Sequence, residues 1–172
     1  MNRMTENFPF LLRFIATTFG AGYWPWGPGT AGAVVGLILW LPLALTGSPL
    51  TALLSTLGLI VVFTALGIWS AGVAERFWGE DPSRVVMDET VGQWITMLPL
   101  SVYAGTVEPL STGAFWGWTL LSLALFRFFD IVKPLGVRKM EALPGGLGIM
   151  ADDILAGIYG AILLAAAMYM FN

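Results

Sequence analysis

The run from Leu50 to Gly72 contains no charged residue. It is long enough to cross the hydrocarbon core of a bilayer, which takes about 20 mostly apolar residues. The rest of the 172-residue chain has the same bias, because 57% of it is hydrophobic and only 11% is charged. So few charged residues cannot cover the surface of a soluble domain of this size. The sequence therefore predicts one integral membrane domain over residues 1–172.

Other apolar stretches extend this prediction to an all-α polytopic helical bundle of about five spans. The four further candidates are Ala31–Thr46 (short, with Pro42 inside), Val91–Val107, Thr112–Phe129 and Ile154–Phe171. Phe8–Phe19 is also apolar, but its length of about 12 residues suits a short interfacial or re-entrant helix rather than a span. A signal peptide is the alternative for this segment, disfavoured by the few basic residues before it.

The basic residues all fall in segments that this five-span topology puts on one side. They are Arg3, Arg13, Arg76, Arg84, Arg127, Lys133, Arg138 and Lys139. The positive-inside rule places that side, and the N-terminus, in the cytoplasm. Every acidic residue except Glu108 falls on the same side. The rule concerns basic residues only, so the gathering of acids there needs another cause.

Residue types that the chain lacks exclude several reaction mechanisms. The sequence contains no His and no Cys, so neither a phosphohistidine nor a thiolate intermediate is available. It also lacks the Asp-x-Asp pair of aspartyl-phosphate phosphatases and the Asp-x-x-x-Asp array of transferases that use CDP-activated lipids. A metal-activated water, or a carboxylate nucleophile, remains for any phosphate chemistry.

A glycine- and proline-rich segment, Gly20–Thr30, precedes the first predicted span. The simplest interpretation is a turn in which Thr30 caps the following helix. Glycine-rich loops at helix N-termini also bind phosphates, although this one matches neither the P-loop nor the dinucleotide pattern. Gly29 and Thr30 are therefore candidate phosphate-binding residues.

Two pairs of adjacent acids open predicted spans, Asp88-Glu89 and Asp152-Asp153. Asp88 and Asp152 are well placed to cap their helices and to complement the helix dipole. Capping explains only one acid of each pair, because adjacent carboxylates repel unless a cation or a proton lies between them. Two such pairs on one membrane face resemble parts of a site for a hard divalent cation such as Mg²⁺, which prefers oxygen ligands.

Arg127, Asp130 and Lys133 recur at a spacing of three near the end of the fourth predicted span. Arg127 and Asp130 share a helix face, so a local salt bridge is the simplest interpretation. The functional alternative is a metal ligand, Asp130, beside cations that bind a phosphate. Ionisable residues at the end of a span are functional candidates by default.

Together these clusters favour metal-assisted phosphate chemistry on a lipid headgroup. An ion transporter or channel with a cytoplasmic acidic site is the alternative, weakened because no acid lies in the middle of a span. A structural or assembly protein, with the acids as caps and salt bridges, is the third hypothesis.

The clusters, in this order, resemble the bacterial phosphatidylglycerophosphatase A family. The resemblance rests on Pro28-Gly29-Thr30, Asp88-Glu89-x-x-Gly92-x-Trp94-Ile95, Phe126-Arg127-x-x-Asp130-x-x-Lys133-Pro134 and Gly148-Ile149-Met150-x-Asp152-Asp153-x-x-Ala156-Gly157. It implies a multi-pass protein of the bacterial inner membrane that hydrolyses phosphatidylglycerol phosphate to phosphatidylglycerol with Mg²⁺, in phospholipid biosynthesis. We expect Asp88, Glu89, Asp130, Asp152 and Asp153 to bind metal or act in catalysis. We expect the phosphate to be held by Arg127, Lys133, Thr30 and Gly29.

Overall fold

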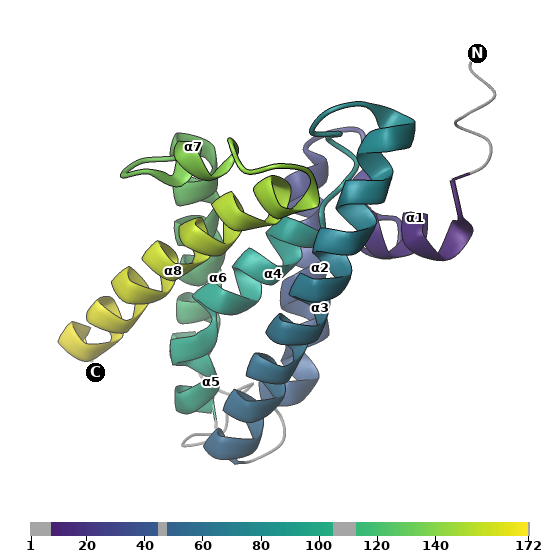
Figure 1. Cartoon of the computed structure of the whole chain (residues 1–172). Coiled ribbons are helices and arrows are strands. Elements are labelled where there is room, and N and C mark those ends of the chain that lie inside the picture. Colours follow the sequence, from purple (N-terminus) through teal and green to yellow (C-terminus); the bar gives the residue numbers. More distant parts are fainter. Residues whose placement is uncertain (1–7, 45–47, 105–112, 172) are drawn as a thin grey trace.

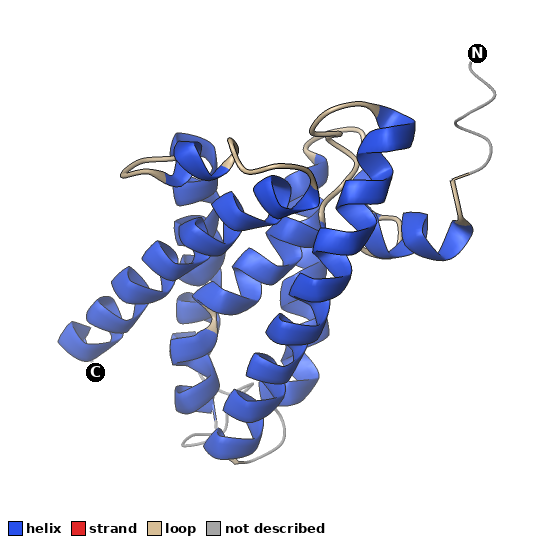
Figure 2. Ribbon diagram, in the orientation of Figure 1, coloured by secondary structure: helices blue, strands red, loops and turns tan. Residues whose placement is uncertain are grey.

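The computed structural model describes residues 8–44, 48–104 and 113–171, and every regular element in them is helical (Figures 1 and 2). The elements are α1 (Phe10–Ala16), the 3₁₀ helix η2 (Ala21–Tyr23), α2 (Pro28–Ala44), α3 (Pro49–Trp78), α4 (Met87–Thr96), α5 (Leu98–Ala104), α6 (Gly113–Val132), α7 (Val137–Met140) and α8 (Gly146–Phe171). The all-α class predicted from the sequence is confirmed.

Three of the described helices, α3, α6 and α8, are long and apolar enough to cross a membrane. The outer face of α3 exposes Leu50, Leu54 and Val61, a continuous apolar surface that suits contact with lipid. Helix α2 is apolar but shorter. The count of five spans stays a prediction, and Glu108 lies outside the described residues.

The predicted third span, Val91–Val107, is not one continuous helix. Helix α4 ends at Thr96 and α5 begins at Leu98. Pro99 explains the break, because proline has no N–H to donate to the carbonyl four residues earlier and its ring crowds that turn. The residues of this segment beyond Ala104 lie outside the described ranges.

Helix α8 begins at Gly146, eight residues before the predicted start at Ile154. The predicted start of this span is therefore wrong, because residues 146–153, which the prediction left outside the span, are helical. Glycine has low helix propensity, but a side chain at Gly146 would collide with the main chain of Ile68 on α3. Close backbone packing against α3 outweighs local propensity at this end of α8.

Helix α4 lies between α2, α6 and α8 (Figure 1), and its residues are all buried except Glu89, which is half-buried. Small residues let the neighbouring helices approach it closely. A methyl group at Gly157 of α8 would lie 2.6 Å from the carbonyl oxygen of Gly92. The indole N–H of Trp94 donates to the carbonyl oxygen of Gly36 on α2 at 2.7 Å. These contacts fix the helix that begins with Asp88 and Glu89.

Candidate active site

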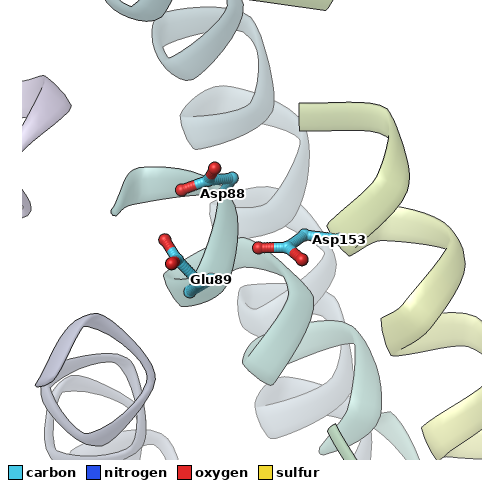
Figure 3. Close-up of side chains that lie close together, drawn as sticks. All are labelled: Asp88, Glu89 and Asp153. Atoms are coloured by element: carbon cyan, nitrogen blue, oxygen red, sulfur yellow. The ribbon is translucent and has the colours of Figure 1, made fainter. Parts of the chain in front are cut away.

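Three carboxylates meet where α4 and α8 pack together. Asp88 and Glu89 lie in the first turn of α4, and Asp153 comes from α8 (Figure 3). One carboxylate oxygen from each residue lies within 4.8 Å of the others. Asp88 and Asp153 are buried, with 8% and 3% of their surface exposed. We call these three residues the acidic triad.

The capping roles expected for Asp88 and Asp152 are wrong. The N-cap of α4 is Val86, which makes no capping hydrogen bond through its side chain. Asp88 follows Met87 in the first turn, where the helix dipole still favours a negative charge. Because α8 begins at Gly146, Asp152 and Asp153 lie in its second turn, inside the helix. Neither Asp152 nor Asp153 therefore caps α8.

The electrostatics of the triad favour a bound cation. Burial, and then the charge of neighbouring Glu89, raise the pKa of Asp88 well above its usual value. Burial also raises the pKa of Glu89. Oδ1 of Asp88 and Oε2 of Glu89 are buried without a hydrogen-bond partner in the described part of the chain. Buried carboxylates with free oxygens are costly unless a proton or metal ion joins them, so this set of oxygen donors fits a divalent cation.

Arg127 brings a positive charge to one side of the triad. Its Nη1 forms an ion pair with Asp130 one turn later on α6, as the spacing predicts. Nε of Arg127 is nevertheless buried and has no hydrogen-bond partner among the described residues, and Nη1 carries a second N–H group besides the one facing Asp130. The negative charge of Asp130 contributes to the raised pKa of Glu89, and the charge of Arg127 opposes it. The guanidinium group is thus held at the triad with spare donors.

The start of α2 closes another side of the triad. A methyl group at Gly29 would collide with the carboxylate of Glu89 and would lie 3.0 Å from Nη1 of Arg127. Only glycine leaves room for both groups here. Helix α2 begins at Pro28, so Thr30 lies in the first turn, and its predicted capping role is wrong. First-turn N–H groups have no partner within a helix, and those of Gly29 and Thr30 are suited to an anion.

Lys133 and Asp152 form a separate group, which we call the ion-pair cluster, together with Glu141. Nζ of Lys133 lies 2.6 Å from Oδ2 of Asp152 and 2.7 Å from Oε1 of Glu141. Burial alone would lower the pKa of Lys133, but its bonds to Asp152 and then Glu141 outweigh burial and raise that pKa. The ammonium group is therefore engaged by two carboxylates. Asp152 faces this cluster, while its neighbour Asp153 faces the triad.

Two residues contribute to the site without any motif in the sequence that predicts it. The first is Glu141, which follows the last residue of α7. Thr18, in a left-handed conformation with φ 43°, donates to the carbonyl oxygen of Val86 at 3.0 Å. Its hydroxyl also lies 3.0 Å from that of Thr90 on α4. This buried contact ties the segment after α1 to the start of α4, beside the acidic pair.

The fold and the site together define a helical membrane protein with a buried acidic centre flanked by arginine. Residues 14–168 match the model of the phosphatidylglycerophosphatase A family. The chain belongs to this family and is a phosphatase, a phosphoric monoester hydrolase. The family resemblance predicted from the sequence is confirmed, and membership favours a phosphatase over an ion transporter.

Named relatives cover nearly the whole chain. A putative phosphatidylinositol-3-phosphatase of Bacteroides thetaiotaomicron is 50% identical over 95% of this chain and 97% of its own. Phosphatidylglycerophosphatase A of Haemophilus influenzae is 36% identical over 96% and 98%. The Escherichia coli protein of the same name is 30% identical over 87% and 79%. No solved structure matches the chain.

Proposed function

We propose that this protein is a Mg²⁺-dependent phosphatase that converts phosphatidylglycerol phosphate to phosphatidylglycerol and inorganic phosphate. One observation carries the proposal: buried carboxylate oxygens of Asp88 and Glu89 without partners lie beside Asp153 and beside an arginine with spare donors. Oxygen donors of this kind suit Mg²⁺, which keeps several waters and binds substrate phosphate as well.

The acidic triad would hold the metal ion, which when bound supplies an activated water and neutralises phosphate charge. Arg127 would then donate its free N–H groups to the phosphate, and Asp130 would keep the guanidinium group oriented toward it. The first-turn N–H groups of Gly29 and Thr30 add neutral donors on the α2 side. Burial of these groups excludes bulk water and strengthens each of their electrostatic contacts.

The remaining two predicted residues take a supporting role in this proposal. Asp152 and Lys133 neutralise each other, so they stabilise the start of α8, which positions Asp153. Because two carboxylates already engage Lys133, we assign direct phosphate contact first to Arg127 and second to Lys133.

A different lipid headgroup is the second candidate substrate. The 50% identical relative is named as a putative phosphatidylinositol-3-phosphatase, whereas the two less similar relatives are named for phosphatidylglycerol phosphate. Both substrates carry a terminal phosphate monoester, which the triad and Arg127 would treat alike. The size of the group next to that phosphate would decide between them.

The membrane side and location are part of the proposal. The basic residues and the acidic centre lie at the same ends of the predicted spans, which the positive-inside rule assigns to the cytoplasm. We infer that the enzyme lies in a bacterial inner membrane and acts on lipids of the cytoplasmic leaflet.

The deciding experiment measures inorganic phosphate released by the purified protein in mixed micelles. Phosphatidylglycerol phosphate and phosphatidylinositol 3-phosphate are compared, each with Mg²⁺ and with EDTA. We expect rapid release from phosphatidylglycerol phosphate that EDTA abolishes and Mg²⁺ restores. Faster release from the phosphoinositide would favour the second candidate, and release that is insensitive to EDTA would overturn the metal assignment.

A further inference from the structure

An apolar groove lies beside the start of α2, on the side facing away from the bundle. Its volume is about 300 Å³, at the small end of the range of ligand pockets. The 3₁₀ helix η2 leads into a pair of tryptophans, Trp24 and Trp26, that form one wall with their rings edge to face. The residues lining the groove include Trp24, Trp26, Gly27, Thr30, Val34 and Val35.

The two faces of α2 show what surrounds this groove. Gly29, Gly32 and Gly36 are buried on the inner face, and Gly32 and Gly36 pack against α4. On the outer face, Thr30 is exposed, Val34 is half-buried and Ile38 is 55% exposed. These three recur every four residues, so they form one stripe along the helix. The apolar side chains of this stripe are suited to contact with lipid, and the groove occupies the end of the stripe nearest the acidic centre.

The groove also adjoins the charged centre. Gly27 and Thr30 line it, and Gly29, between them in sequence, contacts Glu89 and lies near Arg127. Successive Cα atoms are about 3.8 Å apart. A bound molecule whose phosphate lies at Arg127 and whose apolar tail lies in the groove therefore has to extend only around the first turn of α2.

We propose that this groove is a subsite for one fatty acyl chain of the substrate, holding its ester end and first methylenes. The inference rests on the proposed function for the phosphate site, but not on the headgroup, because both candidate substrates carry acyl chains. The occupant follows from three observations: the lining is mostly apolar, the groove lies along the outer stripe of α2, and Gly29, between two lining residues in sequence, contacts the charged centre.

The physical gain from such a subsite is orientation rather than affinity. An acyl chain in a bilayer is already in apolar surroundings, so entering the groove yields little hydrophobic free energy. Holding the chain beside α2 instead fixes where the phosphate lies relative to Arg127 and the triad, and orientation of this kind accelerates reactions. We therefore expect the groove to affect turnover of lipids and not of headgroups alone.

Membrane anchoring by the tryptophans is the competing explanation. Trp26 is 82% exposed, and tryptophans are enriched at membrane interfaces without binding any particular lipid. Anchoring needs only the rings of Trp24 and Trp26. The acyl subsite also needs the open space between those rings and Val34.

The test fills the groove with a side chain. Val34→Trp blocks it, and Ile38→Trp places the same side chain one turn further along the stripe, outside the groove, as the matched control. Each variant is assayed on long-chain phosphatidylglycerol phosphate and on its deacylated, water-soluble headgroup. We expect Val34→Trp to lower kcat/KM for the long-chain lipid by about tenfold, with headgroup hydrolysis unchanged, and Ile38→Trp to change neither.

A second measurement does not depend on activity. A phospholipid with a photoreactive diazirine near its ester group is cross-linked to the wild-type protein and to both variants. We expect the label on residues 24–35 in the wild type and in Ile38→Trp, and its loss in Val34→Trp. Equal labelling of all three proteins would overturn the subsite and leave Trp24 and Trp26 as anchors. If the wild type releases no phosphate but the labelling pattern holds, the proposed function fails and the lipid subsite stands.

Discussion

The acidic triad and the ion-pair cluster use similar residues in opposite ways. In the cluster, Lys133 bonds to Asp152 and Glu141 at 2.6 and 2.7 Å, and only Oδ1 of Asp152 is buried without a partner among the described residues. In the triad, three carboxylates face one another, and two of their buried oxygens have no partner among the described residues. The cluster contains a cation that bonds to both of its carboxylates, whereas no cation among the described residues forms an ion pair with a carboxylate of the triad. This difference, more than the number of acids, supports the proposal that a metal ion binds at the triad.

The sharpest comparison uses the adjacent acids of α8. Asp153→Asn removes a triad carboxylate, and Asp152→Asn is its matched control in the cluster. We expect Asp153→Asn to lower kcat/KM by at least about 100-fold, because even indirect supports of a metal ion cost 10- to 100-fold. Asp152→Asn should cost about tenfold or less. Phosphate release in mixed micelles measures both, and equal losses would remove the functional distinction between the two acids.

The metal should stabilise the triad and leave the cluster unaffected. At a Mg²⁺ concentration about 100 times its Kd, binding adds about 2.7 kcal/mol to the free energy of unfolding. We expect Mg²⁺ to raise the Tm of the wild type and of Lys133→Met, but not of Asp153→Asn. Thermal unfolding in detergent measures this without any substrate. A Mg²⁺ response that survives in Asp153→Asn would show that the ion binds elsewhere.

Removing the central cation of the cluster tests its structural role. Lys133→Met leaves the buried carboxylate of Asp152 without its partner, and hydrogen bonds to charged groups contribute about 1.5–3 kcal/mol. We expect a loss of this size in the free energy of unfolding. The double variant with Asp152→Asn should regain part of it, because the uncompensated charge is gone. Purely additive losses would mean that the two residues do not act as a pair.

Substitution of Glu141, the more exposed partner of Lys133, should have the smallest effect on stability and activity. The side chain of Glu141 is 43% exposed, so water screens its interaction with Lys133. We expect Glu141→Gln to change the free energy of unfolding by less than about 1 kcal/mol. Activity should stay within a factor of two or three of the wild type. A large loss of activity would instead place Glu141, with Lys133, in direct contact with substrate.

The sequence predicts the helical class and the residues of the site better than it predicts their grouping. Long apolar runs determine α3, α6 and α8, because few other structures can bury them. The pairing of Arg127 with Asp130 also follows from local spacing. Pro99 could have indicated the break between α4 and α5, but the apolar run around it favoured a single span.

The grouping of the acids depends on contacts between distant segments. Helix α8 begins at Gly146 because Gly146 packs against Ile68. The helix propensities of the local residues do not reveal this contact. That start decides that Asp152 and Asp153 lie inside a helix, where they point in different directions. Glu141 joins Lys133 only through the fold of the segment between α6 and α8. Three of the five acids predicted as metal ligands form the triad, while Asp130 pairs with Arg127 and also lies close to Asp153 and Glu89. Asp152 pairs with Lys133. The full set of five metal ligands stays a prediction.

Because α8 begins before Asp152, the direction in which each acid points around the helix axis decides its role, although the two acids are neighbours in the sequence. Each residue turns an α-helix by about 100°, and this rotation alone directs Asp153 to the triad and Asp152 to Lys133. One residue inserted between Gly146 and Asp152 would rotate the pair by the same angle without altering its composition. A single insertion would therefore turn Asp152 toward the triad and Asp153 away from both groups, whereas a substitution leaves both directions unchanged.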